Sequence, residues 1–379
     1  MSEAPPAGHE DTWRLVADNA GAWDLAGEIP RTLLTDLGAA GLLCAEVGKQ
    51  YGGLGLASLE GGRLTAHVGS LCSSLRSVMT SQGMAAWTVQ RLGDGGQRAE
   101  FLPQLTGGRL AAVAFSEPQA GSDLGAMETR LRVEGDTVVV DGVKSWITAA
   151  AYADLVVVVA RTPDGSGAAV VVPADAEGVR IERVAHPMGC RAAGHAQVRL
   201  EGVRLPAGNV LGGTAGLSLP FLVTTALAYG RMSVAWGCVG ILRALLAAAG
   251  EHARSRRQFG RPIGEHQLVA GMVADVYAAE RSATAVCRQA SECWESLSPD
   301  LVSATILAKH VSATQAVRAS ALAMQVLASA GATDGHVVAR AYRDAKLMEI
   351  IEGSSEICRL ELARHVLASG GALARGEAR

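Results

Sequence analysis

The spacing of apolar residues changes twice along this chain of 379 residues, and that order constrains the fold most. Residues 11–110 place apolar side chains three and four positions apart, as amphipathic helices do. Residues 111–215 contain short β-branched runs between Glu-Gly and Asp-Gly turns. Helical spacing returns after Gly216. We therefore expect an α+β multidomain protein with an N-terminal α-helical domain (1–110), a central small β-barrel or sandwich (111–215) and a C-terminal helical bundle (216–379).

The individual elements follow from the same patterns. We expect strands at Thr137–Val140, Leu155–Ala160, Ala168–Val172, Val179–Val184 and Ala196–Leu200. The expected turns are at Gly135, Gly142, Gly165, Gly178 and Gly202. In the last part we expect helices at about 217–250, 264–296, 300–331, 335–350 and 354–368, with a frayed tail from Ala368.

Composition excludes several classes of protein. With 49% apolar residues the chain can bury a large core, and its net charge of −3 without a basic stripe argues against a nucleic-acid partner. Seven scattered cysteines suggest neither a disulfide framework nor a metal site, so we expect them to be small core residues. Met1–Glu10 lacks a secretory pattern, which favours a cytoplasmic location. Leu217–Gly250 is very apolar, but Arg231 and Arg243 interrupt it, so we expect a buried bundle helix and no membrane partner.

A carboxylate stands where a helical pattern breaks near the end of the chain. Ile350 and Ile351 precede Glu352, and Gly353 follows it with its unusual backbone freedom. Such apolar surroundings remove hydration from the carboxylate and suit a general base. The alternative is that Glu352 only complements the dipole of a helix that starts at Ser354.

Three other stretches also have simple local explanations. Phe115–Asp123 is rich in proline, glycine and serine and is typical of a turn, although such a loop can also approach a flat ring or a phosphate. In Lys144–Thr148 the tryptophan and threonine would share one face of a strand. Arg254–Gln267 combines a basic cluster with a helix stop at Gly260, which is typical of a solvated helix end.

Together these stretches resemble motifs of the acyl-CoA dehydrogenase family. Ile350–Arg359 is similar to its Tyr-Glu-Gly-Thr-Ser-x-Ile-x-Arg motif, Phe115–Asp123 to its Thr-Glu-Pro-x-Ala-Gly-Ser-Asp motif, and Lys144–Thr148 to its Lys-x-Trp-Ile-Thr motif. Serine replaces the usual threonine at positions 116 and 354 and keeps the hydroxyl. The order helix, β, helix is also that of the family, so the resemblance covers nearly the whole chain and implies an FAD-dependent oxidoreductase that acts on acyl thioesters.

The resemblance implies roles for individual residues. Glu352 would be the catalytic base, Trp146 would pack near the flavin, and Thr148 would donate a hydrogen bond towards flavin N5, which accepts hydride. The residues implied at FAD are Phe115, Ser116, Gly121, Ser122, Trp146, Ile147, Thr148, Arg256, Phe259, Gln267, Gln325, Ser329 and Ser354. The residues implied at the substrate are Ser122, Arg231, Arg76 and Gly353.

Two of the segments imply an oligomer. Arg256–Ile263 matches a family segment that reaches the FAD pyrophosphate of a neighbouring subunit, with Gln267 nearby. Gln325–Gly331 resembles Gln-x-x-Gly-Gly-x-Gly, which contacts the adenylate end across the same interface, although Ala328 and Ser329 stand where two glycines are usual. A homodimer or homotetramer is therefore expected.

A narrower resemblance concerns the substrate. Ser70–Trp87 and Ala345–Ser355 look like the family members that assemble methoxymalonyl-ACP extender units in polyketide pathways. That implies oxidation of a three-carbon 2-hydroxy-3-oxopropionyl group on an acyl carrier protein to hydroxymalonyl-ACP. Arg76 could bind the polar end of such a group, or it could extend to the helix surface. Gly230 precedes Arg231 where some relatives place their base, so Glu352 is the single candidate.

Other functions remain open from the sequence. The first is α,β-desaturation of an acyl-CoA or acyl-ACP, with proton loss from Cα and hydride loss from Cβ. Two further possibilities are a flavin monooxygenase and an FAD-binding subunit without catalytic activity. The presence of Glu352 argues against an inactive subunit. A dehydrogenase of this kind also needs an electron acceptor for its reduced flavin.

Overall fold

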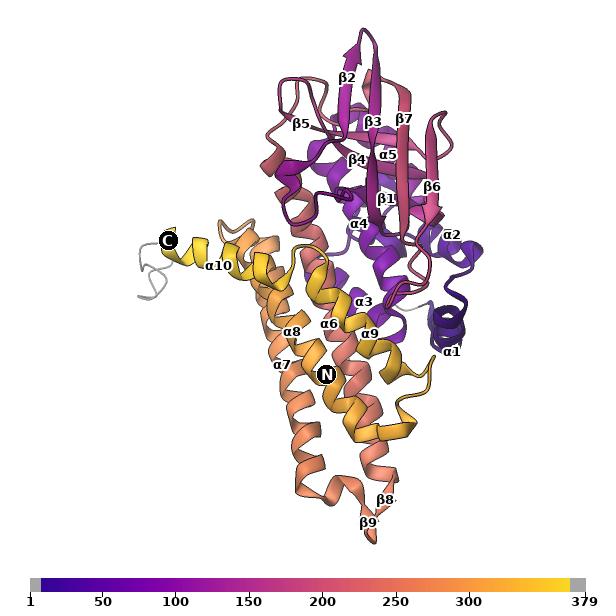
Figure 1. Ribbon diagram of the computed structural model, residues 1–379, viewed down its shortest axis with the longest axis vertical. Coiled ribbons are helices and arrows are strands. Elements are labelled where there is room, and N and C mark those ends of the chain that lie inside the picture. Colours follow the sequence, from indigo (N-terminus) through magenta and orange to yellow (C-terminus); the bar gives the residue numbers. More distant parts are fainter. Residues whose placement is uncertain (1–7, 369–379) are drawn as a thin grey trace. The chain divides into compact units, whose positions relative to one another are not determined.

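The computed structural model describes residues 8–368, which form two compact units (Figure 1). One contains Ala22–Ala57 and Ser74–Gly230, and the other contains residues 8–21, Ser58–Ser73 and residues 231–368. Most of the stretch used to judge a secretory signal, and the tail after Ala368, lie outside the described residues. The predicted division into three domains at 110/111 and 215/216 stays a prediction.

The first unit is built on one curled sheet of seven strands. The strands are β1 (Ala111–Ala114), β2 (Arg130–Glu134), β3 (Thr137–Ile147), β4 (Leu155–Arg161), β5 (Gly167–Pro173), β6 (Val179–Arg183) and β7 (Ala196–Pro206). Their order is β1-β4-β2-β3-β7-β6, with β5 on β4. A single parallel pair, Arg130 with Arg161, joins β2 to β4. The predicted small β domain is confirmed, although β1 and β2 were not predicted.

Two of the predicted turns are wrong. Strands β3 and β7 continue through Gly142 and Gly202 and pair with each other on both sides, with a register shift between Val140 and Gly142. A β-bulge therefore replaces the predicted turns. At Gly142 a Cβ atom would collide with Thr129, so this close approach requires glycine.

Helices α2 (Arg31–Ala39), α4 (Ser73–Leu92) and α5 (Gly95–Thr106) also contribute to this unit. The buried Gln82 of α4 accepts a hydrogen bond from the Ala111 amide at the start of β1, at 2.6 Å. Its Nε2 donates to the carbonyls of Leu105, at 3.1 Å, and Arg109, at 2.8 Å. This glutamine therefore fixes α4 against the first strand. Short 3₁₀ turns lie along the chain at Leu42–Cys44, Lys49–Tyr51, Leu124–Ala126, Ala150–Tyr152, Ala207–Asn209, Ile263–Glu265 and Ala328–Ala330.

The second unit is a helical bundle. Its helices are α3 (Ser58–Leu71), α7 (Gln267–Glu295), α8 (Leu301–Leu327), α9 (Val337–Ile350) and α10 (Ser355–Ala368), with the start of α1 (Glu10–Ala26) and the part of α6 (Leu219–Ser255) from Arg231 onwards. Helices α6 to α9 run side by side in Figure 1. From α6 onwards the predicted ranges agree with these bounds within five residues. A Cβ at Gly240 of α6 would collide with the backbone of α3, so glycine permits this close helix contact.

Helix α6 is long and apolar enough to cross a membrane by length and composition. However, 72% of its most apolar 18-residue window is buried inside the protein. The buried Trp236 of this helix donates from Nε1 to Ser291 Oγ of α7 at 3.2 Å. This burial agrees with the predicted bundle helix. The prediction that the cysteines are small core residues also agrees with the structure, because six of the seven are buried. Burial raises the pKa of Cys44 and of Cys287 to about 12.

Candidate active site

Glu352 lies in the junction between α9 and α10, as the sequence analysis expected. Its φ angle is +55° and that of Gly353 is +92°, so both residues have left-handed backbone. This conformation costs a non-glycine residue of order 1 kcal/mol or more, and it persists only where the surroundings impose it. The backbone at the candidate base is therefore held in place by other groups.

Two buried cations hold this junction. Arg231 donates from Nε to the Glu352 carbonyl at 3.0 Å, and Lys309 donates from Nζ to the Gly353 carbonyl at 2.6 Å. Lys309 is 0% exposed and also donates to the Glu349 carbonyl at 3.3 Å. Burial lowers the pKa of Lys309 and of Arg231, while nearby groups, Glu352 among them, act in the opposite direction. Lys309 was not predicted, because a single lysine in an apolar helix gives no local signal.

The helix that follows has its own cap. Ser354 Oγ accepts a hydrogen bond from the Ile357 amide at 3.4 Å, and Glu356 places an acid in the first turn. Both are standard stabilisers of a helix start. The start of α10 therefore does not require Glu352, which weakens the alternative that this carboxylate serves only the helix dipole.

The two motifs predicted to line the flavin meet at a buried ion pair. Lys144 Nζ lies 2.9 Å from Glu117 Oε1, and the Ser145 amide donates to the Ser116 carbonyl at 2.9 Å. Burial alone would raise the pKa of Glu117, but hydrogen bonds from Glu128, Thr129 and Lys144 lower it to about 2. Burial lowers the pKa of Lys144 to about 8, against the effect of Glu117. This pair joins the loop after β1 to strand β3.

The loop itself exposes small groups. Phe115 is buried, whereas Gly121 and Ser122 are exposed. A Cβ at Gly121 would meet nothing within 4 Å, so the missing side chain leaves open space beside the loop. Such space suits the close approach of a planar ring.

Strand β3 presents a tryptophan at its end. A register shift between Lys144 and Ile147 accompanies a φ angle of +59° at Trp146, whose side chain is 56% exposed while Ile147 is buried. The Thr148 carbonyl accepts a hydrogen bond from Ser81 Oγ at 3.0 Å. The prediction from strand alternation, that Trp146 and Thr148 share one strand face, is wrong, because β3 ends at Ile147. An exposed indole and, two residues later, a threonine hydroxyl are groups that suit the isoalloxazine ring of FAD.

Two further buried polar side chains belong to the same unit. His195 Nδ1 is 3.3 Å from Thr148 Oγ1, and the His195 ring lies 5.9 Å from the Trp146 ring. Arg76 in α4 is 0% exposed and donates from Nη1 to Thr80 Oγ1 at 3.2 Å. The alternative in which Arg76 extends to the helix surface is therefore wrong. His195 was missed, since the preceding residues follow no pattern that singles it out.

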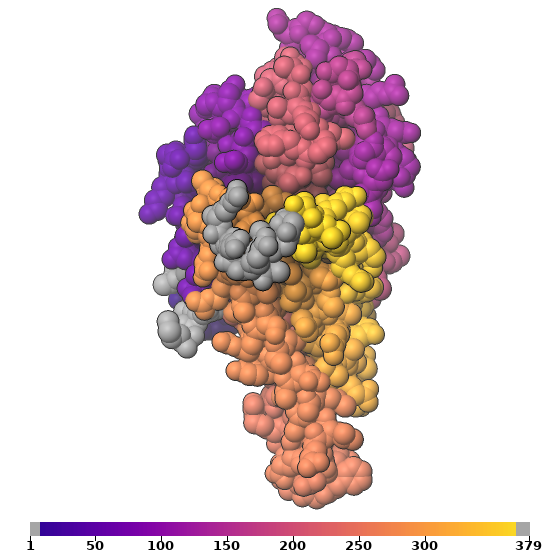
Figure 2. Space-filling view, turned by 90° about the vertical axis from the view of Figure 1, so that its left-hand side faces the viewer, coloured from indigo at the N-terminus to yellow at the C-terminus, as the bar shows by residue number. Residues whose placement is uncertain are grey.

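The residues predicted at a subunit interface lie on exposed parts of the bundle unit. Helix α6 ends at Ser255, five residues before the predicted stop at Gly260, and a hairpin of β8 (Arg257–Gln258) and β9 (Arg261–Pro262) follows. Figure 2 shows this end of the bundle as a protruding tip. At the turn, Phe259 has a φ angle of +50° and is 92% exposed. The other predicted interface side chains are also exposed: Arg256, Gln267, Gln325 and Ser329.

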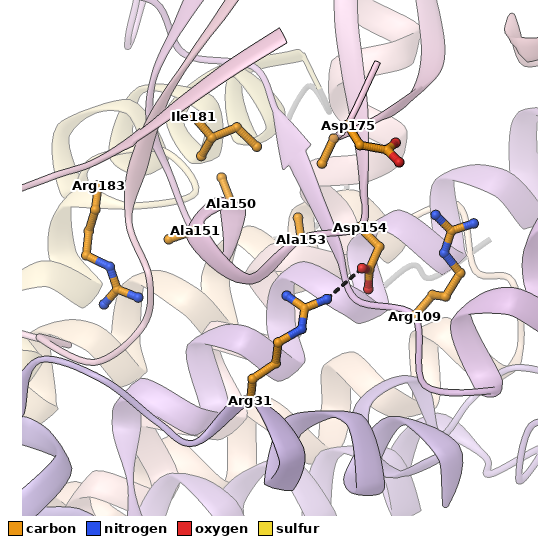
Figure 3. A pocket seen from close by; sticks show the side chains of 10 residues that line it. Arg31, Arg109, Ala150, Ala151, Ala153, Asp154, Asp175, Ile181 and Arg183 are labelled. Carbon is orange, nitrogen blue, oxygen red and sulfur yellow. Dashed lines mark hydrogen bonds and ion pairs between the residues drawn. The ribbon is translucent and has the colours of Figure 1, made fainter. Parts of the chain in front are cut away.

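A separate pocket of about 500 Å³ lies in the sheet unit (Figure 3). Its three arginines already have partners: Arg31 pairs with Asp154 at 2.6 Å, Arg109 with Gln104 at 2.6 Å, and Arg183 with the Gly27 carbonyl at 2.6 Å. None of the predicted site residues lines it.

Comparison with known proteins identifies the family of this chain. Three models of acyl-CoA dehydrogenase domains match in order: the N-terminal domain at residues 13–109, the middle domain at 112–203 and the C-terminal domain at 221–367. The probable acyl-CoA dehydrogenase YngJ of Bacillus subtilis is 35% identical over 359 residues, covering 93% of this chain and 94% of its own. The mouse mitochondrial short-chain specific acyl-CoA dehydrogenase is 31% identical, covering 90% of this chain and 83% of its own.

Solved structures give the same result. The structure of FkbI, for biosynthesis of the methoxymalonyl extender unit of the FK520 polyketide, has 66% identity and a TM-score of 0.91, covering 95% of this chain and 99% of its own. Glutaryl-CoA dehydrogenase from Mycobacterium smegmatis has 29% identity and a TM-score of 0.89, covering 94% and 92%. This chain therefore belongs to the acyl-CoA dehydrogenase family of FAD-dependent oxidoreductases.

Proposed function

We propose that this enzyme oxidises a 2-hydroxy-3-oxopropionyl group on an acyl carrier protein to hydroxymalonyl-ACP. The observation that supports this substrate is the 66% identity to FkbI, a protein of methoxymalonyl extender-unit biosynthesis, over 95% of this chain. Bound FAD supplies the hydride acceptor. The chain supplies a base, a polar substrate site and a rigid backbone around the base.

Glu352 is the proposed base. In the hydrated aldehyde, the carbon loses a hydride and one hydroxyl loses a proton, which leaves the carboxylic acid. Glu352 receives that proton, and Arg231 and Lys309 fix its backbone through the carbonyls of residues 352 and 353. A base that keeps one position avoids the entropy cost of finding it during the reaction.

The remaining proposed site residues form three groups, according to what each would bind. Phe115, Ser116, Gly121, Ser122, Ser354 and the segment 146–148 would hold the flavin, while Gly353, Arg231, Ser122 and Arg76 would contact the thioester. Arg256, Phe259, Gln267, Gln325 and Ser329 would reach the FAD of a neighbouring subunit in a homodimer or homotetramer. A cytoplasmic location and a separate protein acceptor for the electrons complete the proposal.

The decisive experiment is anaerobic titration of the flavin with acyl thioesters. The 2-hydroxy-3-oxopropionyl group is offered on acyl carrier protein and on CoA, and the product is identified by mass spectrometry. We expect bleaching of the flavin and formation of hydroxymalonyl-ACP. Bleaching by butyryl thioesters with a 2,3-unsaturated product, and no reaction of the oxygenated thioester, would instead establish α,β-desaturation, which the similarity to short-chain acyl-CoA dehydrogenase favours.

A further inference from the structure

His195 contacts both side chains that the proposed function places at the flavin ring. It stands immediately before β7, its side chain is 7% exposed, and its Nδ1 lies 3.3 Å from Thr148 Oγ1. Its ring lies 5.9 Å from the ring of Trp146. A buried histidine in this place is in position to affect what binds beside the cofactor.

The imidazole is neutral at physiological pH. Burial, and then the positive charge of Arg76, lower the pKa of His195 to about 4. A neutral imidazole has one N–H donor and one acceptor nitrogen. The chemistry of the site therefore depends on which nitrogen carries the proton.

The contact with Thr148 selects the tautomer. If the Thr148 hydroxyl donates its proton towards the cofactor, its oxygen remains free to accept a hydrogen bond from Nδ1–H. Nε2 is then the acceptor nitrogen. This atom is fully buried and has no hydrogen-bond partner among residues 8–368. Buried polar atoms almost always have partners in folded proteins, so an atom without one indicates a missing ligand.

We propose that His195 Nε2 accepts a hydrogen bond from a hydroxyl of the acyl group. The proposal rests on the proposed function and narrows it to oxygenated three-carbon acyl groups. Arg76 contributes a buried positive charge that favours oxygen-rich groups. Propionyl would leave Nε2 unpaired, and a site that pairs with a hydroxyl discriminates against the analogue that lacks it.

Substitutions at His195 can separate its two nitrogens. The amide of His195→Asn reaches the Nδ1 position and keeps the contact with Thr148, but it leaves the Nε2 position empty. The longer amide of His195→Gln reaches the Nε2 position instead. His186→Asn, at an exposed histidine of the preceding loop, is the matched control.

The test measures dissociation constants of 2-hydroxypropionyl, 3-hydroxypropionyl and propionyl thioesters, on one carrier, from changes in the flavin spectrum. We expect the parent enzyme to prefer at least one hydroxylated thioester over propionyl. In His195→Asn that preference should fall roughly 3- to 10-fold, the effect of one hydrogen bond, while propionyl binding stays the same. His195→Gln should keep part of the preference, and His186→Asn all of it.

Other outcomes have distinct meanings. A parent enzyme without any preference, or a preference that survives in His195→Asn, overturns the inference. Equal weakening for all three thioesters also overturns it, because it indicates a structural role. If either variant does not fold, nitrogen NMR of the labelled parent decides: the Nε2 resonance must shift with the preferred hydroxylated thioester and not with propionyl. Lack of turnover of the oxygenated acyl-ACP, with the binding preference intact, refutes only the proposed function.

Discussion

Lys309 Nζ lies 2.6 Å from the carbonyl oxygen of Gly353, although the two residues are 44 positions apart in the sequence. The lysine belongs to α8, and the carbonyl belongs to the left-handed junction that follows α9. The same ammonium group contacts the Glu349 carbonyl in the last turn of α9. One buried charge therefore joins the end of a helix to the residue after the candidate base.

We predict that Lys309→Met slows anaerobic flavin reduction on the order of 10- to 100-fold, because small displacements of a catalytic group have effects of this size. Bound FAD should stay the same. The dependence of the rate on alkaline pH gives a second readout. Because burial lowers the pKa of Lys309, the rate of the parent enzyme should begin to decline at a pH below the ordinary pKa of lysine. The variant should lack that decline. Lys346→Met, at an exposed lysine of α9, is the control. Parent-like rates in Lys309→Met would show that the junction holds without this charge.

For Glu352→Gln we predict a larger loss, about 10²- to 10⁴-fold in the rate of flavin reduction, the usual contribution of a general base. The backbone should stay in place, because Arg231 and Lys309 contact carbonyls that the substitution does not alter. Thioester binding should therefore change little, and stopped-flow measurement separates it from reduction. Glu356→Gln in the first turn of α10 should behave like the parent. Parent-like reduction in Glu352→Gln would require a different base.

The helices were predictable because each has a long apolar periodicity that tertiary contacts reinforce. Strands β1 and β2 were not predicted. Ala111–Ala114 is only four residues long and contains one β-branched residue, and Arg130–Glu134 exposes alternate charged residues and has little apolar signal. The bulge at Gly142 was also missed, because a glycine needed for close packing looks the same in sequence as one needed for a turn.

The candidate site divides in the same way. Glu352, Trp146 and Thr148 stand in contiguous motifs, so the sequence alone could suggest them. Lys309 and His195 are isolated polar residues whose roles depend on partners 44 and 47 positions away. A local sequence pattern does not predict contacts between residues so far apart in the chain, so these partners are known only from the folded structure.

The buried pair of Glu117 and Lys144 predicts how stability depends on pH. The pKa of Glu117 is about 2, below its ordinary value of 4.5, so its contribution is complete above pH 4.5 and is lost as pH falls from 4.5 towards 2. Glu117→Gln leaves Lys144 buried without its partner, and we expect a loss of about 3–5 kcal/mol in the free energy of unfolding at pH 7. The difference from the parent should shrink below pH 4.5.

Urea unfolding at several pH values measures both effects. Glu134→Gln is the control, since its pair with Arg204 is largely exposed, and it should change stability by less than about 1 kcal/mol. A difference between Glu117→Gln and the parent that stays constant from pH 7 to pH 3 would contradict the pKa assigned to Glu117.

Phe259 provides a test of the proposed subunit interface. It combines a left-handed φ angle of +50° with 92% exposure, which is unfavourable in an isolated subunit. Phe259→Gly removes the ring and relaxes the turn, so the hairpin itself should not be weakened. We expect subunit association to weaken at least about 10-fold, the effect of losing an aromatic anchor, with faster loss of FAD on dilution.

Leu297→Gly is the matched control, because Leu297 also has a φ angle of +50° and is 73% exposed, in the segment between α7 and α8. Analytical ultracentrifugation measures association. An unchanged association constant for Phe259→Gly would place the interface elsewhere.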